Sequence, residues 1–118
     1  MKEGTHRYYD REGNIEGAEI FNRGKKTAEG IINEKGDYQG LWKLYYDAGE
    51  LKAEGEFENN NRIGEWIIYH KNGEIEHRAK YVEGLPQGRW TWYFDNGTLR
   101  REEYYRRGKE DGESTEYD

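Results

Sequence analysis

Apolar and polar residues alternate along short segments of this chain, and turn residues separate the segments. Between Gly64 and Val82, two alternating segments flank Lys71-Asn72-Gly73-Glu74. Side chains point to opposite faces in turn along a β-strand, so the pattern predicts two strands that each have one apolar face. Asn-Gly tolerates positive φ at both positions, and we expect a two-residue type I′ turn between the strands. The stretch therefore predicts a β-hairpin.

The hairpin pattern recurs in register every 24 residues. The central copy has the skeleton Gly64, Trp66, Tyr69, Gly73, Ile75 and Tyr81. The later copy has Gly88, Trp90, Tyr93, Gly97, Leu99 and Tyr105, and the earlier copy has Gly40, Trp42, Tyr45, Gly49, Leu51 and Phe57. Self-similarity at a fixed period indicates a repeat protein. We expect regular units over residues 40–63, 64–87 and 88–111.

The two ends of the chain fit this skeleton less well. Residues 4–39 form a degenerate unit, with His6 at the Trp position and an offset of 36 residues from Gly4 to Gly40. The excess of about half a repeat predicts an added strand and a longer loop around residues 27–39. Residues 112–118 begin a further unit in which Ser114 takes the Trp position. This partial unit fits either a polar end cap or a repeat cut short.

The whole chain, residues 1–118, is predicted to be one all-β repeat array. Its antiparallel β-hairpins should form a single elongated, twisted meander sheet of about ten strands, joined on the return side by longer polar connections such as residues 58–63 and 82–87. One face should be aromatic, and the other should carry charged side chains and a column of tyrosines: Tyr9, Tyr45, Tyr69, Tyr93 and Tyr117. An uncovered apolar face is unusual in a soluble monomer. Three solutions are open: the aromatics pack on each other, two copies pair, or a partner binds.

Composition narrows the class of protein. Hydrophobic residues make up 32% and charged residues 37%, close to the range of disordered chains, but the aromatic content of 15% is periodic. A net charge of −6 argues against nucleic-acid partners and makes a membrane surface an unfavoured one. The absence of cysteine excludes disulfides and thiolate metal sites. No signal peptide or membrane-spanning run is present, which predicts a cytoplasmic location if the chain is complete.

The residues that carry chemistry are few. His70 and His77 should lie diagonally on one face, but no third ligand is near them in the pattern. Ser114 has no histidine or cysteine at a spacing typical of a nucleophilic triad. We therefore expect no enzyme, no metal and no cofactor.

Aromatic side chains are the candidates for binding. Trp42, Trp66 and Trp90 could act as stacking platforms, and Arg101 should lie opposite Trp92 in a cation–π contact. The full candidate set is Trp42, Trp66, Trp90, Trp92, Tyr46, Phe94 and Arg101. Basic residues also outnumber acidic ones between Glu76 and Lys109. This stretch fits either a patch for an acidic partner or lipid headgroup, or a solvated face with cross-strand ion pairs.

The spacing of Gly, Trp and Tyr over residues 40–51 resembles the bacterial variant of the MORN repeat (membrane occupation and recognition nexus). The resemblance covers residues 40–118 and, less regularly, reaches back to Gly4, with His6, Ser114 and the N-terminal insert as departures. It implies stacked β-hairpins that serve as interaction or scaffold modules. Some bacterial members are similar to antitoxins, and eukaryotic relatives are linked to membrane phospholipid. Choline-binding cell-wall repeats are a weaker match because their period is nearer 20.

Together these observations predict a non-catalytic module for protein–protein interaction or scaffolding. One alternative is an antitoxin or immunity protein that neutralises a toxin. The other is a phospholipid- or glycan-binding module that uses the aromatic ladder. The expected partner is another protein, and a homodimer is an open alternative.

Overall fold

The structure is a computed structural model that describes residues 3–112 and 114–117, and within these ranges its only regular elements are β-strands. The strands are β1 (Gly4–Tyr9), β2 (Ile15–Asn22), β3 (Lys25–Ile32), β4 (Tyr38–Tyr45), β5 (Leu51–Glu58), β6 (Asn61–Tyr69), β7 (Ile75–Val82), β8 (Leu85–Pro86), β9 (Gly88–Tyr93), β10 (Leu99–Arg106), β11 (Lys109–Glu110) and β12 (Thr115–Glu116).

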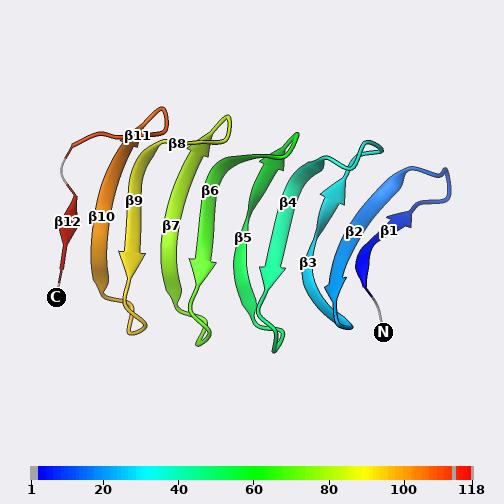
Figure 1. The fold of residues 1–118 in the computed structure, drawn as a ribbon, viewed down its shortest axis with the longest axis horizontal. Helices are drawn as coiled ribbons and strands as arrows, with labels where there is room; N and C mark the ends of the chain where they lie inside the picture. The colour runs from blue at the N-terminus through cyan, green and yellow to red at the C-terminus, as the bar shows by residue number, and fades with distance from the viewer. Residues whose placement is uncertain (1–2, 113, 118) are drawn as a thin grey trace.

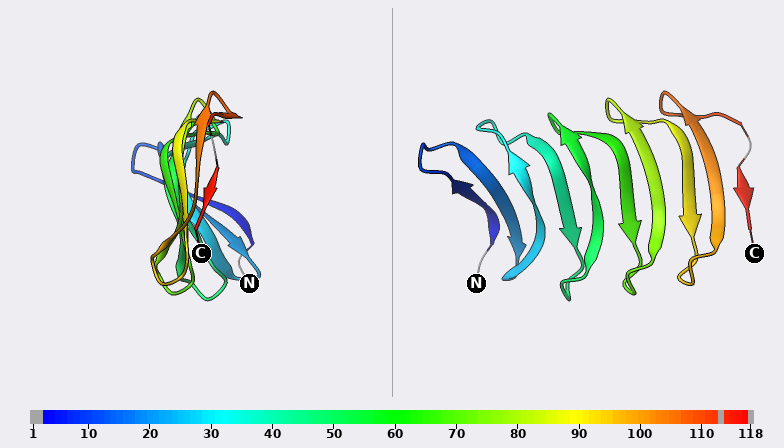
Figure 2. Two further views of the ribbon diagram at one scale, coloured as in Figure 1. Left: turned by 90° about the vertical axis from the view of Figure 1, so that its left-hand side faces the viewer. Right: turned by 180° about the vertical axis from the view of Figure 1, so that it is seen from behind.

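All of these strands belong to one antiparallel sheet (Figures 1 and 2). The segments β8 and β9 both pair with β7, and β11 and β12 both pair with β10. The twelve segments therefore fill ten positions, and the predicted all-β meander is confirmed. The molecule measures 51 × 31 × 19 Å, which corresponds to a single layer along most of its length.

The turn between β6 and β7 differs from the prediction. Tyr69 pairs with Ile75, and the backbone N–H of Gly73 donates to the carbonyl of His70 at 2.9 Å. Gly73 has a φ of 91°, but Asn72 is not in the left-handed region. The expected type I′ turn is therefore wrong. The loop is a type I turn followed by a left-handed glycine, and a register shift follows Ile68.

The two-residue type I′ turns lie instead at the return connections, which were expected to be longer. In each, both central residues have positive φ: Arg23-Gly24, Asn59-Asn60, Glu83-Gly84 and Arg107-Gly108. The twist of a type I′ turn matches that of the flanking strands, so these strands pair up to the turn itself. The expectation of long connections is wrong. Arg and Glu at the first turn position are weak signals for this geometry, whereas both residues of Asn59-Asn60 tolerate positive φ and signal it in the sequence.

The N-terminal insert supplies one additional strand, β3, as predicted. One extra strand reverses chain direction, so the β1–β2 hairpin is turned by half a revolution about the long axis of the sheet relative to the later hairpins. Its loop lies at the edge opposite the β4–β5 loop (Figure 1). This half revolution also exchanges the two faces of the β1–β2 hairpin. The pairing shows it: His6 pairs with Glu19, Glu19 with Glu29, and Glu29 with Lys43.

We call the two sides of the sheet the tryptophan face, which carries Trp42, Trp66 and Trp90, and the tyrosine face, which carries Tyr45, Tyr69 and Tyr93. Paired residues share a face in an antiparallel sheet. His6 therefore lies on the tyrosine face, although it holds the Trp position of its unit. The expected place of Tyr9 in the tyrosine column is wrong, because Tyr9 follows Tyr8 of the tyrosine face and so lies on the tryptophan face.

The core lies on the tryptophan face, where the indoles of Trp42 and Trp66 each cover a glycine of the preceding strand. Gly64 has a φ of 65°, and β6 has two more residues than β5 between the pairs Glu54–Ile67 and Glu56–Ile63. This bulge lets Trp66 lie flat on Gly55, where an added Cβ would be 2.1 Å from the indole. The indole Nε1 donates to the carbonyl of Glu56 at 3.0 Å. Glycine at position 55 is therefore required by the close approach of the ring.

The same contact recurs in the neighbouring units. Trp42 covers Gly30, and its Nε1 donates to the carbonyl of Ile31 at 2.9 Å. The Nε1 of Trp90 donates to the carbonyl of Lys80 at 3.0 Å. The aromatics also contact one another, as in the stacked pair Tyr38–Trp42 with centroids 4.2 Å apart. Of the three solutions for the aromatic face, the structure shows mutual packing.

Candidate binding surfaces

Two of the predicted stacking platforms are buried in the core. Trp42 is 0% exposed and Trp66 is 2% exposed. Trp42 lies against Tyr38, and Trp66 contacts Phe57 edge-on with centroids 4.9 Å apart. Their rings therefore stabilise the stack of hairpins and present no open face to a ligand in this structure.

The indoles of Trp90 and Trp92 are only partly covered. His77 stacks on Trp92 with centroids 4.4 Å apart, and Arg101 lies 5.3 Å from the Trp92 ring on the paired strand. The predicted cation–π contact is confirmed. Arg101 also forms an ion pair with Glu103. Trp92 is therefore held between a histidine and an arginine of neighbouring strands.

Tyr46 and Phe94 lie at equivalent positions near the loop edge of the sheet. The Tyr46 hydroxyl donates to the carbonyl of Tyr69 at 2.6 Å, and Arg100 lies 6.0 Å from the Phe94 ring. At the position between them, His70 Nε2 is 2.9 Å from the carbonyl of Tyr93. The seven predicted residues thus extend from β4 to β10 and do not form one compact site. Their role in binding stays a prediction.

The histidines of the tryptophan face are occupied by backbone contacts. His77 Nδ1 is 2.8 Å from the carbonyl of Thr91, and burial lowers the pKa of His77. Within residues 3–112 and 114–117, no group of three His, Cys, Asp or Glu side chains is arranged to hold a metal ion. The structure therefore identifies no metal centre in the part of the chain that it describes.

The basic stretch is partly neutralised on the tyrosine face. Arg78 pairs with Glu65 at 2.6 Å, and Arg89 pairs with Glu102 at 2.7 Å. Both are cross-strand ion pairs, and their arginines are exposed to solvent although Glu102 is mostly covered. They support the interpretation of a solvated charged face for this part of the stretch.

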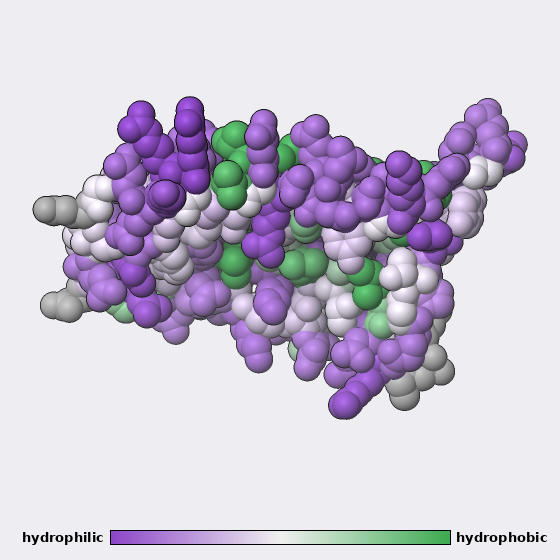
Figure 3. Space-filling model, turned by 45° about the horizontal axis from the view of Figure 1, so that its top comes forward, coloured by the Kyte–Doolittle hydropathy of each residue, from purple (hydrophilic) through white to green (hydrophobic). Residues whose placement is uncertain are grey.

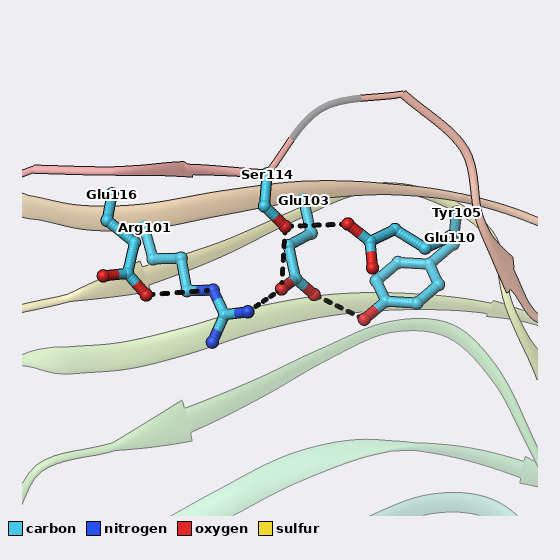
Figure 4. A network of polar contacts seen from close by, with 6 residues as sticks. All are labelled: Arg101, Glu103, Tyr105, Glu110, Ser114 and Glu116. Atoms are coloured by element: carbon cyan, nitrogen blue, oxygen red, sulfur yellow. Dashed lines mark hydrogen bonds and ion pairs between the residues drawn. The ribbon is translucent and has the colours of Figure 1, made fainter.

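A polar cluster replaces the Trp stack beyond Trp90 (Figure 4). Glu103 pairs with Trp90 across β9 and β10 and is only 4% exposed. Its carboxylate accepts hydrogen bonds from Tyr105 and Ser114 and pairs with Arg101. These partners hold the pKa of Glu103 below its ordinary value, with the Tyr105 bond as the main cause, although burial opposes them.

The tyrosine face is hollowed at its N-terminal end, where a groove of about 590 Å³ crosses β1 to β4. Gly17 and Gly30 form its floor, and Tyr8 and Leu41 form apolar walls. The two walls are 43% and 53% exposed. We call this cavity the N-terminal groove. Its residues were not among the predicted site, because they meet only through the reversed N-terminal hairpin.

A chain of polar contacts runs along the charged side of the N-terminal groove. Lys26 pairs with Glu19 at 3.3 Å and with Glu29 at 2.9 Å. Glu29 also accepts a hydrogen bond from Tyr45. Burial and the Glu29 carboxylate raise the pKa of Tyr45 to about 12. The carboxylates of Glu19 and Glu29 thus share the ammonium group of Lys26.

Elsewhere, hydrophobic surface is scattered. Figure 3 shows separate hydrophobic spots between hydrophilic side chains, along the top and across the middle of that view. The most exposed large hydrophobic side chains include Leu41, Val82, Leu85 and Tyr9. No helix of the described residues has the length and apolar character needed to cross a membrane.

Comparison with protein families agrees with the geometry. The model of the MORN repeat variant matches residues 38–59, 62–83 and 86–107, which together exceed half of the chain. The chain belongs to the MORN repeat variant family. A comparison with curated proteins finds no match.

Proposed function

We propose that this chain is a non-catalytic repeat module that binds another protein across its tyrosine face. The contrast between the two faces supports this function. Aromatic packing covers the indoles of Trp42 and Trp66 on the tryptophan face, whereas the tyrosine face exposes Leu41, Tyr8 and several carboxylates in an extended layer. Membership of the MORN repeat variant family also supports a binding module. A mixed apolar and charged surface is typical of non-obligate interfaces.

The chemistry of the N-terminal groove fits binding better than catalysis. Its described lining consists of carboxylates, one lysine, one tyrosine and small or apolar residues, without histidine, serine or cysteine. The groove is open, and Glu19 and Glu29 are already paired with Lys26. An acid–base enzyme would need titratable groups whose environments set their pKa values apart near neutrality.

The test begins with affinity capture on the immobilised chain and continues with calorimetric titration of each captured protein after purification. Glu56 is exposed on the tyrosine face, and Glu83 is exposed at a turn. We expect Glu56→Lys to weaken binding about tenfold and Glu83→Lys to change it less than about twofold. The proposal is wrong if no purified protein binds with a Kd below about 100 μM. It is also wrong if both substitutions act equally.

A narrower form of the proposal makes the chain an antitoxin. The net charge of −6 suits a basic toxin, and the resemblance to bacterial antitoxin-like repeats motivates it. Co-expression should then rescue cells from a captured toxin, and Glu56→Lys should reduce the rescue. Binding without any change in the partner's toxicity would leave the scaffold function and remove the antitoxin one.

The C-terminal aromatics support a second candidate, a phospholipid- or glycan-binding surface. Trp92 and Phe94 are partly exposed, and Arg101 and Arg100 lie over their rings. A surface of this kind should shift tryptophan fluorescence when anionic vesicles or oligosaccharides are added, and Trp92→Ala should remove the shift. Unchanged fluorescence with both ligand classes would exclude this candidate.

A further inference from the structure

The N-terminal groove exists because the reversed hairpin places a glycine where a regular unit has a covered side chain. Gly17 corresponds to Ala53 of the first regular unit, which is buried on the tryptophan face between its strand partners Leu44 and Ile68. Gly17 pairs with Tyr8 on the tyrosine face instead. A Cβ on Gly17 would contact only the carbonyl of Gly30, at 3.6 Å. The floor of the groove is therefore bare backbone.

The walls of the groove suit an amphipathic side chain. Leu41 and Tyr8 offer apolar surface on two sides of the glycine floor. The carboxylates of Glu16, Glu19 and Glu29 line the same cavity, against a single lysine, Lys43. A ligand that is apolar along its stem and positively charged at its tip satisfies both kinds of wall.

The chain itself shows how this face holds a cation. Lys26 lies outside the cavity lining, but its ammonium bridges Glu19 and Glu29 and lies 5.3 Å from the Tyr45 ring centroid. An internal cation thus uses two carboxylates and an aromatic ring. Glu16 and Tyr8 provide a similar combination inside the groove. The Glu16 carboxylate has no ion pair within residues 3–112 and 114–117.

We propose that the N-terminal groove binds an arginine side chain of a partner protein. The methylenes lie on Gly17 and against Leu41, and the guanidinium stacks on the Tyr8 ring and pairs with Glu16. Arginine fits better than lysine because its planar group both stacks on an aromatic ring and binds a carboxylate through two N–H groups. This inference rests on the proposed function in one respect, namely that a partner protein supplies the arginine.

The test uses a small probe, so it does not depend on knowing the partner. Acetyl-Gly-Arg-Gly-amide is titrated into the isotope-labelled chain, and amide shifts are followed by NMR. We expect millimolar binding, with a Kd of about 1–10 mM, and shifts at the amides of Gly17, Ala18 and Gly30. The same peptide with neutral citrulline in place of arginine should shift these amides far less.

Three variants locate the site. Gly17→Leu fills the floor in open space and should abolish the shifts, whereas Glu16→Gln should weaken binding about threefold. Glu83→Gln removes a charge from an exposed turn outside the groove and should bind as the wild type does. Circular dichroism and unfolding curves of each variant confirm that it is folded.

Distinct outcomes separate this inference from the proposed function. Equal binding of the citrulline peptide, or shifts that persist in Gly17→Leu, would overturn the arginine site and leave the proposed function to its own test. If the peptide binds but Gly17→Leu binds the purified partner as tightly as the wild type, the inference is again wrong, because the partner does not use the groove. Loss of both interactions in Gly17→Leu supports it.

Discussion

On the tryptophan face, the residue at the Trp position of each hairpin covers a residue of the preceding strand. We call this contact a slot, the covering residue its lid and the covered residue its floor. The sizes of lid and floor are reversed between the middle of the sheet and its C-terminal end. In the middle, a large lid, Trp66, covers a floor without a side chain, Gly55. At the end, Ser114 is the small lid, and Glu103 is the large floor residue at the position equivalent to Gly55. Lid and floor change together, so the slot stays filled. The close packing of protein interiors explains this pairing of sizes.

The slot between these two shows an intermediate case. Ala79 corresponds to Gly55, and Trp90 of the next strand lies near it but is less buried than Trp66. Along the three slots, the floor residue is glycine, then alanine, then glutamate. The lid is a buried tryptophan, then a less buried tryptophan, then serine. A carboxylate also holds the equivalent position in the reversed N-terminal hairpin, where Glu19 pairs with Lys26 on the tyrosine face. Among the described residues, a carboxylate thus replaces the small residue only in the first and last hairpins, and the first of these carboxylates lies on the tyrosine face.

The largest expected effect comes from removing the interior lid. Trp66→Ala should lower the free energy of unfolding by about 4 kcal/mol, because it opens a cavity above Gly55 and loses the hydrogen bond to Glu56. Ser114→Ala at the equivalent position should cost about 1 kcal/mol or less. Urea unfolding of both variants measures the contrast. Similar losses would contradict the assignment of the interior slot as the core.

The interior floor should be the next most sensitive position. Gly55→Ala should cost about 2–3 kcal/mol, because its Cβ would overlap the Trp66 ring and force it out of place. Gly17→Ala is the matched control, since its Cβ meets only an ordinary contact and its φ is not in the left-handed region. Equal tolerance at both glycines would show that the indole does not lie on Gly55 in solution.

The C-terminal slot should accept an indole once its floor residue is made small. We expect Glu103→Ala combined with Ser114→Trp to be more stable than the sum of the single changes by about 1–2 kcal/mol, because the new indole can cover a small floor as Trp90 does. Each single change alone should destabilise, since one leaves a hole and the other overfills the slot. A double-mutant cycle measures the coupling, and additive effects would argue that lid and floor are independent.

The smallest expected effect is a dependence on pH. The pKa of Glu103 in the folded chain is lowered from its ordinary value of 4.5, so the unfolded chain binds the proton more readily. The stability that Glu103 contributes is complete above its ordinary pKa and is lost as the pH falls through its folded pKa. Glu103→Gln should therefore lose less stability than the wild type between about pH 5 and pH 3. The measurement is the free energy of unfolding of both proteins as a function of pH. Parallel curves for Glu103→Gln and the wild type over this range would rule out this contribution.

The hairpins were predictable because their signals are local. Alternation in residues 64–82 and the 24-residue period of Gly, Trp and Tyr suffice to predict the strands and the meander. The turn types were not predictable in the same way. Asn72-Gly73 suits a type I′ turn by composition, yet the register shift between β6 and β7 gives it a longer loop. The predicted Arg101–Trp92 contact followed from register alone, and the same register holds in the structure.

Local patterns in the sequence suffice to predict an array of β-hairpins with one aromatic face, because periods of two and of 24 residues are visible without knowledge of distant contacts. The face that the first hairpin presents is set by the assembled sheet and could not be predicted from these patterns. That outcome depends on the number of strands inserted before Gly40, and one strand turns Gly17, Glu19 and Tyr8 to the opposite side. The N-terminal groove arises from this reversal, since its walls come from β1 and β4, which face each other across β2 and β3 only in the assembled sheet.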